Sequence, residues 1–135
     1  KNNFNQEKSF EGFLAHISSI SERSNSQIFQ DLFVDYILNK SNGFFCEVGA
    51  CDGEVHSNTL WLEKNKNWKG ILCEPSVQFH EKIKINRPDC IIEKQPIFSE
   101  NENEANFVDQ KGGRSFLDYS SKLDNIVAND AKIGI

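Results

Sequence analysis

The fold of this chain can be read from one stretch, Phe44-Phe45-Cys46-Glu47-Val48-Gly49-Ala50-Cys51-Asp52-Gly53. Its first half is short and apolar, which is typical of a β-strand, and its second half carries glycines that suit a tight loop. Residues 57–62 then combine small polar residues with an apolar run, as at the start of a helix. This order favours a turn that holds an anionic or nucleotide ligand, because the free N–H groups of a helix start attract negative charge.

Working outward from this stretch, the spacing of apolar residues predicts helices upstream and alternating helices and strands downstream. Upstream helices are expected at residues 6–22 and 27–39, with Ser24 and Gln27 as a capping box and His16 solvated, off the apolar stripe. Residues 1–42 are therefore predicted to form an N-terminal helical segment.

Downstream, the pattern predicts a β-α-β-α-β order. In chain order we expect a strand at 44–48, a helix at 58–66 capped by Ser57 or Asn58, a strand at 71–74, a helix at 77–86 behind Ser76, a third strand at 89–98 and a short strand at 105–108. The first strand is nearly all apolar, as expected for a strand covered on both faces. Pro96 removes a ladder donor, which assigns the third strand to a sheet edge.

This order predicts an α/β fold with a Rossmann-like parallel sheet in residues 43–135, where ligands bind at the carboxyl ends of the strands. The chain has 135 residues, 38% of them hydrophobic, and a formal net charge of -5, which argues against nucleic acid as a partner. No apolar run approaches the ~20 residues that cross a bilayer, so we expect a cytoplasmic protein without a membrane partner.

The four cysteines, Cys46, Cys51, Cys73 and Cys90, show no Cys-x-x-Cys spacing, so no metal site is predicted. Cys46 and Cys73 lie in apolar runs and are predicted to be buried as small hydrophobic residues. The chain begins at Lys1 and contains no methionine, so we expect it to be an excised part of a longer protein.

Two carboxylates fall at the predicted strand ends. Glu74 follows the glycine loop by about twenty residues, the offset at which a carboxylate binds the ribose of a nucleotide, although it could instead cap the following helix. Glu47 lies inside an apolar strand, where a charge is costly unless it is paired, and a cationic ligand group or ordered water would relieve that cost. Asp52 is as well explained as a turn residue.

The loop does not match the dinucleotide or triphosphate motifs. A nicotinamide-binding Gly-x-Gly-x-x-Gly would need glycine where Cys51 and Glu54 stand, and the Gly-Lys-Ser/Thr of a P-loop is missing. The loop is better suited to a ligand without a pyrophosphate, and S-adenosylmethionine combines a ribose with a zwitterionic amino-acid end.

Several ordered segments closely resemble FkbM-type methyltransferases. The matching segments are Ser26-Gln27-x-x-Gln30-Asp31-x-Phe33, Gly43-Phe44-Phe45-x-Glu47-Val48-Gly49-Ala50-x-Asp52-Gly53, Ser57-Asn58-Thr59-x-x-Leu62-Glu63, Trp68-x-Gly70-Ile71-Leu72-x-Glu74-Pro75 and Asn86-Arg87. The resemblance implies a class I, Rossmann-like methyltransferase fold and S-adenosylmethionine-dependent methylation, usually at a hydroxyl oxygen of a sugar or natural product. The fourth strand of that family has no counterpart before Ile135, so we expect the sheet to be truncated and the acceptor site incomplete.

The resemblance also implies residues of a cofactor site. These are Glu47, Gly49, Ala50 and Gly53 at the methionine moiety, Asn58 and Thr59 at its carboxylate, Glu74 at the ribose hydroxyls, Pro75 on the adenosine side, and Ile97 or Phe98 beside the adenine. Cys51 departs from the family, since many such methyltransferases carry a third glycine there. No catalytic base is predicted, because His56 and His80 are better explained as solvated surface residues.

Two other functions stay open at this point. One is a nicotinamide-dependent oxidoreductase, which the missing glycines disfavour. The other is a non-catalytic methyltransferase-like module that assembles with a partner or with itself, because a truncated sheet would leave an edge and apolar helix faces exposed.

Overall fold

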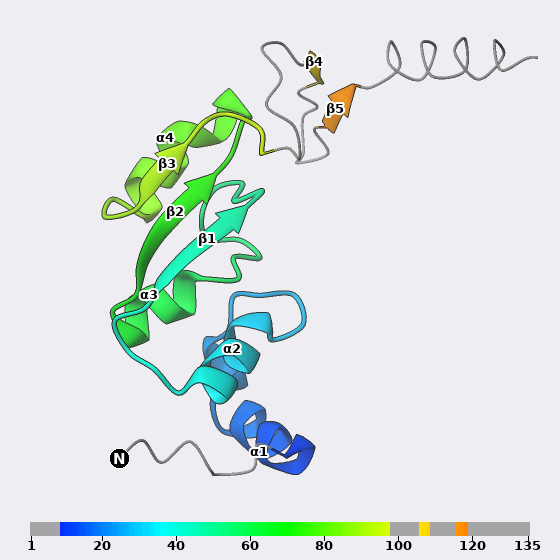
Figure 1. Cartoon of the computed structure of the whole chain (residues 1–135), viewed down its shortest axis with the longest axis vertical. Helices are drawn as coiled ribbons and strands as arrows, with labels where there is room; N and C mark the ends of the chain where they lie inside the picture. Colours follow the sequence, from blue (N-terminus) through cyan, green and yellow to red (C-terminus); the bar gives the residue numbers. More distant parts are fainter. Residues whose placement is uncertain (1–8, 98–105, 109–115, 119–135) are drawn as a thin grey trace, which may run out of the picture. The chain divides into compact units, whose positions relative to one another are not determined.

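The computed structural model describes residues 9–97, 106–108 and 116–118 (Figure 1). The chain divides into two compact units, Lys1–Gln95 and Pro96–Ile135. In chain order the first unit contains α1 (Phe10–Ile20), a 3-10 turn (Ser21–Arg23), α2 (Gln30–Leu38), β1 (Phe44–Val48), α3 (Leu60–Lys66), β2 (Lys69–Cys73), α4 (Val77–Asn86) and β3 (Ile91–Glu93). The predicted bounds of β1 and α4 are confirmed, and the division predicted after residue 42 stays a prediction.

The strands of the first unit form a parallel sheet in the order β1-β2-β3, so the described part of the chain is a mixed α/β fold. Phe45 of β1 pairs with Gly70 of β2, and Leu72 of β2 pairs with Ile92 of β3. Gly70 is required here, since a Cβ at that position would lie 2.2 Å from the Phe45 ring. The third strand lies at a sheet edge, as Pro96 predicted, but it is shorter than predicted.

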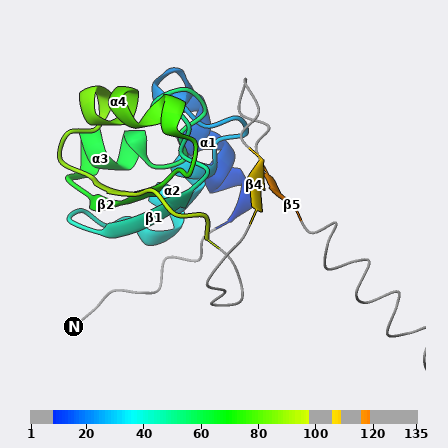
Figure 2. The same cartoon turned by 90° about the horizontal axis from the view of Figure 1, so that it is seen from above.

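Helices α3 and α4 both lie on one side of this sheet (Figure 2). Between them and the strands lies the core of the unit. Its buried members are Leu32, Phe45, Ala50, Trp61, Leu62, Trp68, Leu72 and Ile83. The burial of apolar surface, which contributes about 25 cal/mol per Å², is the main contribution to holding these helices on the sheet.

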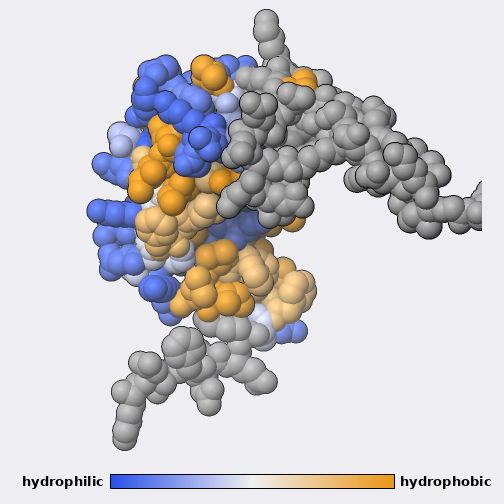
Figure 3. Space-filling model, turned by 45° about the horizontal axis from the view of Figure 1, so that its top comes forward, coloured by the Kyte–Doolittle hydropathy of each residue, from blue (hydrophilic) through white to orange (hydrophobic). Residues whose placement is uncertain are grey.

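No described helix or strand covers the opposite side of the sheet, which corrects the prediction that the first strand is covered on both faces. Burial alternates along β1, and Phe44 and Val48 are 64% and 62% exposed. Ile91 at the start of β3 is 60% exposed. Apolar surface, drawn in orange, is visible over the described part of the chain (Figure 3). Cys73 is buried as predicted, but Cys46 lies on the open side and is exposed, so that prediction was wrong.

The start of α2 differs from the predicted capping box. The helix begins at Gln30 behind Phe29, whose φ of 62° lies in the left-handed region. The hydroxyl groups of Ser24 and Ser26 both donate to Oδ1 of buried Asp31, each at 2.7 Å. The hydroxyl group of Ser24 therefore binds the buried carboxylate of Asp31 in the first turn of the helix and does not form the predicted capping box.

His16 is also placed differently from the prediction. Its Nε2 lies 3.1 Å from Oδ2 of Asp35 on α2, and Lys66 Nζ of α3 lies 2.8 Å from Oδ1 of the same carboxylate. Asp35 is buried, so it needs such partners. The predicted solvated histidine instead helps to join α1 to α2.

In the second unit, β4 (Asn106–Val108) and β5 (Phe116–Asp118) pair antiparallel, with Phe107 opposite Leu117. The first of these strands was predicted and the second was not. Among the described residues, no helix combines the length and the apolar character that crossing a bilayer requires.

Candidate functional site

The candidate site lies where β1 and β2 end, at the loop that leads from β1 to α3. The backbone N–H groups of Gly49 and Ala50 both donate to the carbonyl oxygen of Cys73, at 2.9 and 3.2 Å. This ties the start of the loop to the end of β2. Gly49, Cys51 and Gly53 have φ values of 77°, 49° and 79°. Cys51 thus holds a left-handed conformation that glycine adopts more easily, which explains in physical terms why glycine would suit this position.

The two glycines of the loop have different surroundings. Gly49 is exposed, and a Cβ placed on it would meet no atom within 4 Å, so its backbone faces open space. Gly53 is buried, and a Cβ there would lie 2.9 Å from Cγ of Arg87. Of the two, only Gly49 leaves free space beside its Cα atom, while its N–H is already bonded to Cys73. Ala50, between them, belongs to the core.

Glu74 follows β2 directly and turns its carboxylate toward this loop. Its Oε2 accepts a hydrogen bond from the backbone N–H of Cys51 at 2.8 Å, and its Oε1 accepts one from the N–H of Ser76 at 2.9 Å. Glu74 is 5% exposed. The second bond is the helix-start contact that the sequence left open, while the first brings the carboxylate to the glycine loop. The helix-start contact of Glu74 does not exclude the predicted ribose contact, because a carboxylate has about four positions that accept hydrogen bonds.

Glu47 is held by the protein itself. Its Oε1 accepts from the backbone N–H of Asn58 at 2.7 Å, and its Oε2 accepts from the hydroxyl groups of Ser57 and Thr59. Arg87 Nη1 lies 4.0 Å from Oε2. These donors supply what a buried carboxylate requires. The cation that relieves the cost of burying Glu47 is thus an arginine of the same chain.

Arg87 is the centre of this buried polar cluster. It is 0% exposed. Its guanidinium group donates to five oxygen-bearing groups or lies beside them: Glu63 through Nε, Gly53 O and Ser57 Oγ through Nη1, Thr59 Oγ1 through Nη2, and Glu47 at the longer distance given above. Sequence reasoning quoted Arg87 only as part of a resembling motif and assigned it no role. The missed signal was the buried Glu47, which requires a cationic partner somewhere in the chain.

The start of α3 carries the two residues predicted at the cofactor carboxylate. Thr59 is buried, and its hydroxyl group is engaged by Glu47 and Arg87. Ser57 Oγ accepts from the backbone N–H groups of Thr59 and Leu60, so Ser57 caps the helix. Asn58 differs from its neighbours, because its Oδ1 atom is buried and has no hydrogen-bond partner. An unpaired buried acceptor is costly, so Asn58 is the residue here with unused capacity for a donor.

The remaining predicted residues have different outcomes. Pro75 follows Glu74 and is half-buried. Ile97 is exposed and lies in the second unit, and Phe98 lies outside the described residues. His56 is exposed in the loop, as predicted. His80 is buried instead of solvated, with Nε2 at 2.7 Å from the carbonyl oxygen of Glu74, so its predicted surface position was wrong.

Carboxylates lie near the Cys51 thiol, while the cation of Arg87 reaches the other end of the loop at the carbonyl oxygen of Gly53. Burial raises the pKa of the Cys51 thiol, and the charges of Glu74, Asp52 and Glu47 raise it further. Three carboxylates therefore act on one thiol in the loop. A region of this kind favours a cationic ligand group over a phosphate-bearing one.

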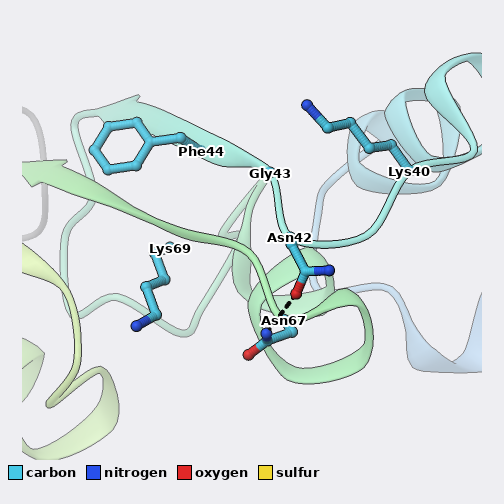
Figure 4. A pocket seen from close by; sticks show the side chains of 6 residues that line it. All are labelled: Lys40, Asn42, Gly43, Phe44, Asn67 and Lys69. Carbon is cyan, nitrogen blue, oxygen red and sulfur yellow. Dashed lines mark hydrogen bonds between the residues drawn. The ribbon is translucent and has the colours of Figure 1, made fainter.

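Two hollows in the first unit have linings that include neither Gly49 nor Glu74. One, of about 420 Å³, is lined by Lys40, Asn42, Gly43, Phe44, Asn67 and Lys69 (Figure 4). It lies at the amino ends of β1 and β2, and the two lysine ammonium groups point in different directions (Figure 4). The other, of about 440 Å³, is lined by Asn25, Glu54, Leu60, Lys64 and Asn86. Its lining carries one acidic and one basic side chain, Glu54 and Lys64.

Comparisons with known proteins found no match to the chain among family models, curated proteins or solved structures.

Proposed function

We propose that this chain is the cofactor-binding part of a cytoplasmic S-adenosylmethionine-dependent methyltransferase that acts on a hydroxyl group of a sugar or natural product. The observation that carries the proposal is the bond from the Cys51 N–H to Glu74, beside the open backbone of Gly49. A strand-end carboxylate and an accessible glycine turn thereby meet at the carboxyl edge of a parallel sheet, which is where ligands of such sheets bind.

The residues at this edge fit the chemistry of the cofactor. Glu74 uses one acceptor position on each oxygen, which leaves about two for the hydroxyl groups of a ribose. The unpaired Oδ1 of Asn58 accepts hydrogen bonds, so it suits the ammonium group of the cofactor and not the carboxylate that the resemblance assigns to this residue. The carboxylates around Cys51 favour a sulfonium cation and disfavour a pyrophosphate, which supports this cofactor over a nicotinamide dinucleotide.

In this proposal the chain binds and orients, while the cofactor supplies an electrophilic methyl group. Glu74 fixes the nucleoside end, and Glu47 acts indirectly by holding the start of α3, from which Asn58 extends. Methyl transfer depends mainly on placing the two reacting atoms at the right distance and in line. A direct contact of Glu47 with the cofactor stays a prediction, as do the contacts of Ile97 and Phe98.

Isothermal titration calorimetry with S-adenosylhomocysteine tests the proposal. We expect the unsubstituted chain to bind S-adenosylhomocysteine. The Glu74→Ala variant should lose ~1.5–3 kcal/mol of binding free energy, which is the value of hydrogen bonds to a charged group. Glu81→Gln, which removes an exposed carboxylate from α4, is the control and should bind as the parent does. Thermal melting of each variant verifies that it is folded.

Two results would contradict the proposed methyltransferase function. If the folded parent chain binds no S-adenosylhomocysteine, the methyl-donor site is wrong. If it binds NADH, followed by the fluorescence of the nicotinamide, the oxidoreductase alternative takes its place. An unchanged affinity in a folded Glu74→Ala variant would leave the cofactor assignment standing but exclude Glu74 from it.

A further inference from the structure

The open side of the sheet brings two cysteines together. Cys46 on β1 and Cys73 on β2 approach each other there, with their Sγ atoms 3.7 Å apart. Cys46 is exposed and Cys73 is buried beside it. The pair can therefore be reached from solvent through Cys46, and the candidate cofactor site uses the carbonyl oxygen of Cys73 but not its sulfur.

The strand register argues against a direct disulfide bond. Cys46 pairs with Ile71, and Cys73 pairs with Val48, so the cysteines are diagonal neighbours, two residues apart along the strands. With strands about 4.8 Å apart and a rise of about 3.3 Å per residue, their Cα atoms are separated by roughly 8 Å. A disulfide bond needs Cα atoms within about 7 Å, so forming one would require the strands to shift.

The same sulfur separation suits an atom bound between the two cysteines. A zinc–thiolate bond is about 2.3 Å long, and two such bonds to sulfurs 3.7 Å apart enclose an angle of about 107° at the metal, which is nearly tetrahedral. Thiolates select soft metal ions, whereas hard ions such as Mg²⁺ require oxygen ligands. We propose that Cys46 and Cys73 form a two-sulfur binding site for a soft, thiophilic divalent metal ion.

The surroundings define what completes the site. In the part of the chain that the structure describes, no third His, Cys, Asp or Glu side chain extends the pair into a larger ligand set. In this proposal water or other small ligands fill the two remaining positions of a tetrahedral ion, one position more than at an open zinc site with three protein ligands. The exposed position of Cys46 gives these ligands access from solvent.

Metal binding at this pair exchanges protons for the ion. Thiol ligands bind a metal ion in their deprotonated form, so metal binding at the two cysteines displaces the protons that their sulfurs carry. A divalent ion that binds both sulfurs forms two metal–sulfur bonds and releases two thiol protons to solvent. No oxidation state changes, so the step needs neither an oxidant nor a reductant.

Titration of the whole chain with Cd²⁺, followed by thiolate-to-metal charge-transfer absorbance, tests this site. We expect one ion per chain. We also expect at least about tenfold weaker binding in Cys46→Ser, since removing one of two protein ligands costs at least as much as removing a supporting residue. This variant changes an exposed side chain, so it should fold. Cys51→Ser and Cys90→Ser are matched controls and should bind Cd²⁺ as the parent chain does.

Alkylation provides a second readout on the parent chain. Bound Cd²⁺ should protect Cys46 from iodoacetamide, as measured by mass spectrometry of the digested protein, and should leave Cys51 unprotected. The proposal is overturned by unchanged Cd²⁺ affinity in Cys46→Ser, by affinity that depends on Cys51 or Cys90, or by Cys46 that reacts equally fast with and without the ion. One ion per two chains would contradict the solvent-completed site.

Discussion

Glu47 and Glu74 are both buried carboxylates near the ends of neighbouring parallel strands, yet their surroundings differ. Glu47 accepts hydrogen bonds from two hydroxyl groups and one backbone N–H, and it has the guanidinium group of Arg87 nearby. Glu74 accepts from two backbone N–H groups and has no cation within ion-pair distance among the described residues. One carboxylate is surrounded by side chains of the protein core, and the other borders an open glycine turn.

The difference separates a structural role from a binding role. A buried charge that already has a cationic partner contributes to holding helices on the sheet, and removing the partner leaves an uncompensated charge. A carboxylate bound only by backbone amides has acceptor positions left for the hydroxyl groups of a ligand. The following predictions test this contrast, beginning with the largest expected effect.

Replacing Arg87 should have the largest effect on stability. Arg87→Met would leave buried Glu47 without its cation and half-buried Glu63 with Lys64 alone, and breaking a buried pair from one side costs about 3–5 kcal/mol. Urea unfolding followed by the fluorescence of Trp61 and Trp68, both buried, measures the free energy of unfolding. Lys84→Met, which removes an exposed cation from the same helix, is the control and should change it by less than about 0.5 kcal/mol. A loss below about 1 kcal/mol in Arg87→Met would show that the cluster contributes little.

The pair Glu47→Gln and Glu74→Gln tests the contrast itself. Glu47→Gln should lower the free energy of unfolding by ~1.5–3 kcal/mol because it removes a charge-assisted set of bonds, and Glu74→Gln should lower it by about 1 kcal/mol. For S-adenosylhomocysteine the order should reverse, with the larger loss of affinity in Glu74→Gln. Urea unfolding and calorimetry on the same samples provide both numbers. If one variant has the larger loss in both measurements, the separation of roles is wrong.

Replacing Gly53, which contacts Arg87, should lower the free energy of unfolding more than replacing Gly49, which borders open space. Ala in the left-handed region costs roughly 1–2 kcal/mol, which applies to Gly49→Ala and Gly53→Ala alike. Gly53→Ala should cost about 1 kcal/mol more, because its Cβ would press on Cγ of Arg87, whereas a Cβ at Gly49 meets open space. Urea unfolding of both variants tests this difference. Equal losses would mean that Arg87 moves aside without cost.

The order of elements could be predicted from sequence because it depends on local patterns. An apolar run bounded by Gly43 and Gly49 defines β1, and the segment between Ser76 and Arg87 defines α4. Burial on the second face of the sheet could not be predicted this way. Phe44 and Cys46 are apolar whether or not another element packs on them. The sequence of the strand therefore does not distinguish an exposed second face from a covered one.

The candidate site could be predicted in part for a related reason. The positions of Gly49 and Glu74 follow from strand ends, and their meeting through Cys51 follows from parallel pairing. The partner of Glu47 does not follow, because Arg87 is distant in sequence and several cations could have served. The burial of His80 was missed although its partner, the Glu74 carbonyl oxygen, is only six residues away, because the sequence does not show which face of α4 turns toward the end of β2.

The smallest expected effect concerns Glu63, the second carboxylate beside Arg87, and its dependence on pH. Burial alone would raise its pKa, but hydrogen bonds from Cys90 and Arg87 and the charge of Arg87 outweigh burial and lower the pKa below its ordinary 4.5. A lowered pKa in the folded state stabilises the protein above the unfolded pKa, and this contribution is lost as pH falls through the folded pKa.

The parent chain should therefore exceed Glu63→Gln in free energy of unfolding by about 1 kcal/mol at neutral pH, and the gap should narrow below about pH 4.5. Urea unfolding at a series of pH values measures that gap. Glu22→Gln, which changes an exposed carboxylate, should show no such narrowing. A gap that stays constant or widens in acid would mean that Glu63 is not held in its ionised form by Arg87, and the guanidinium group would then be satisfied mainly by Glu47 and the carbonyl and hydroxyl oxygens around it.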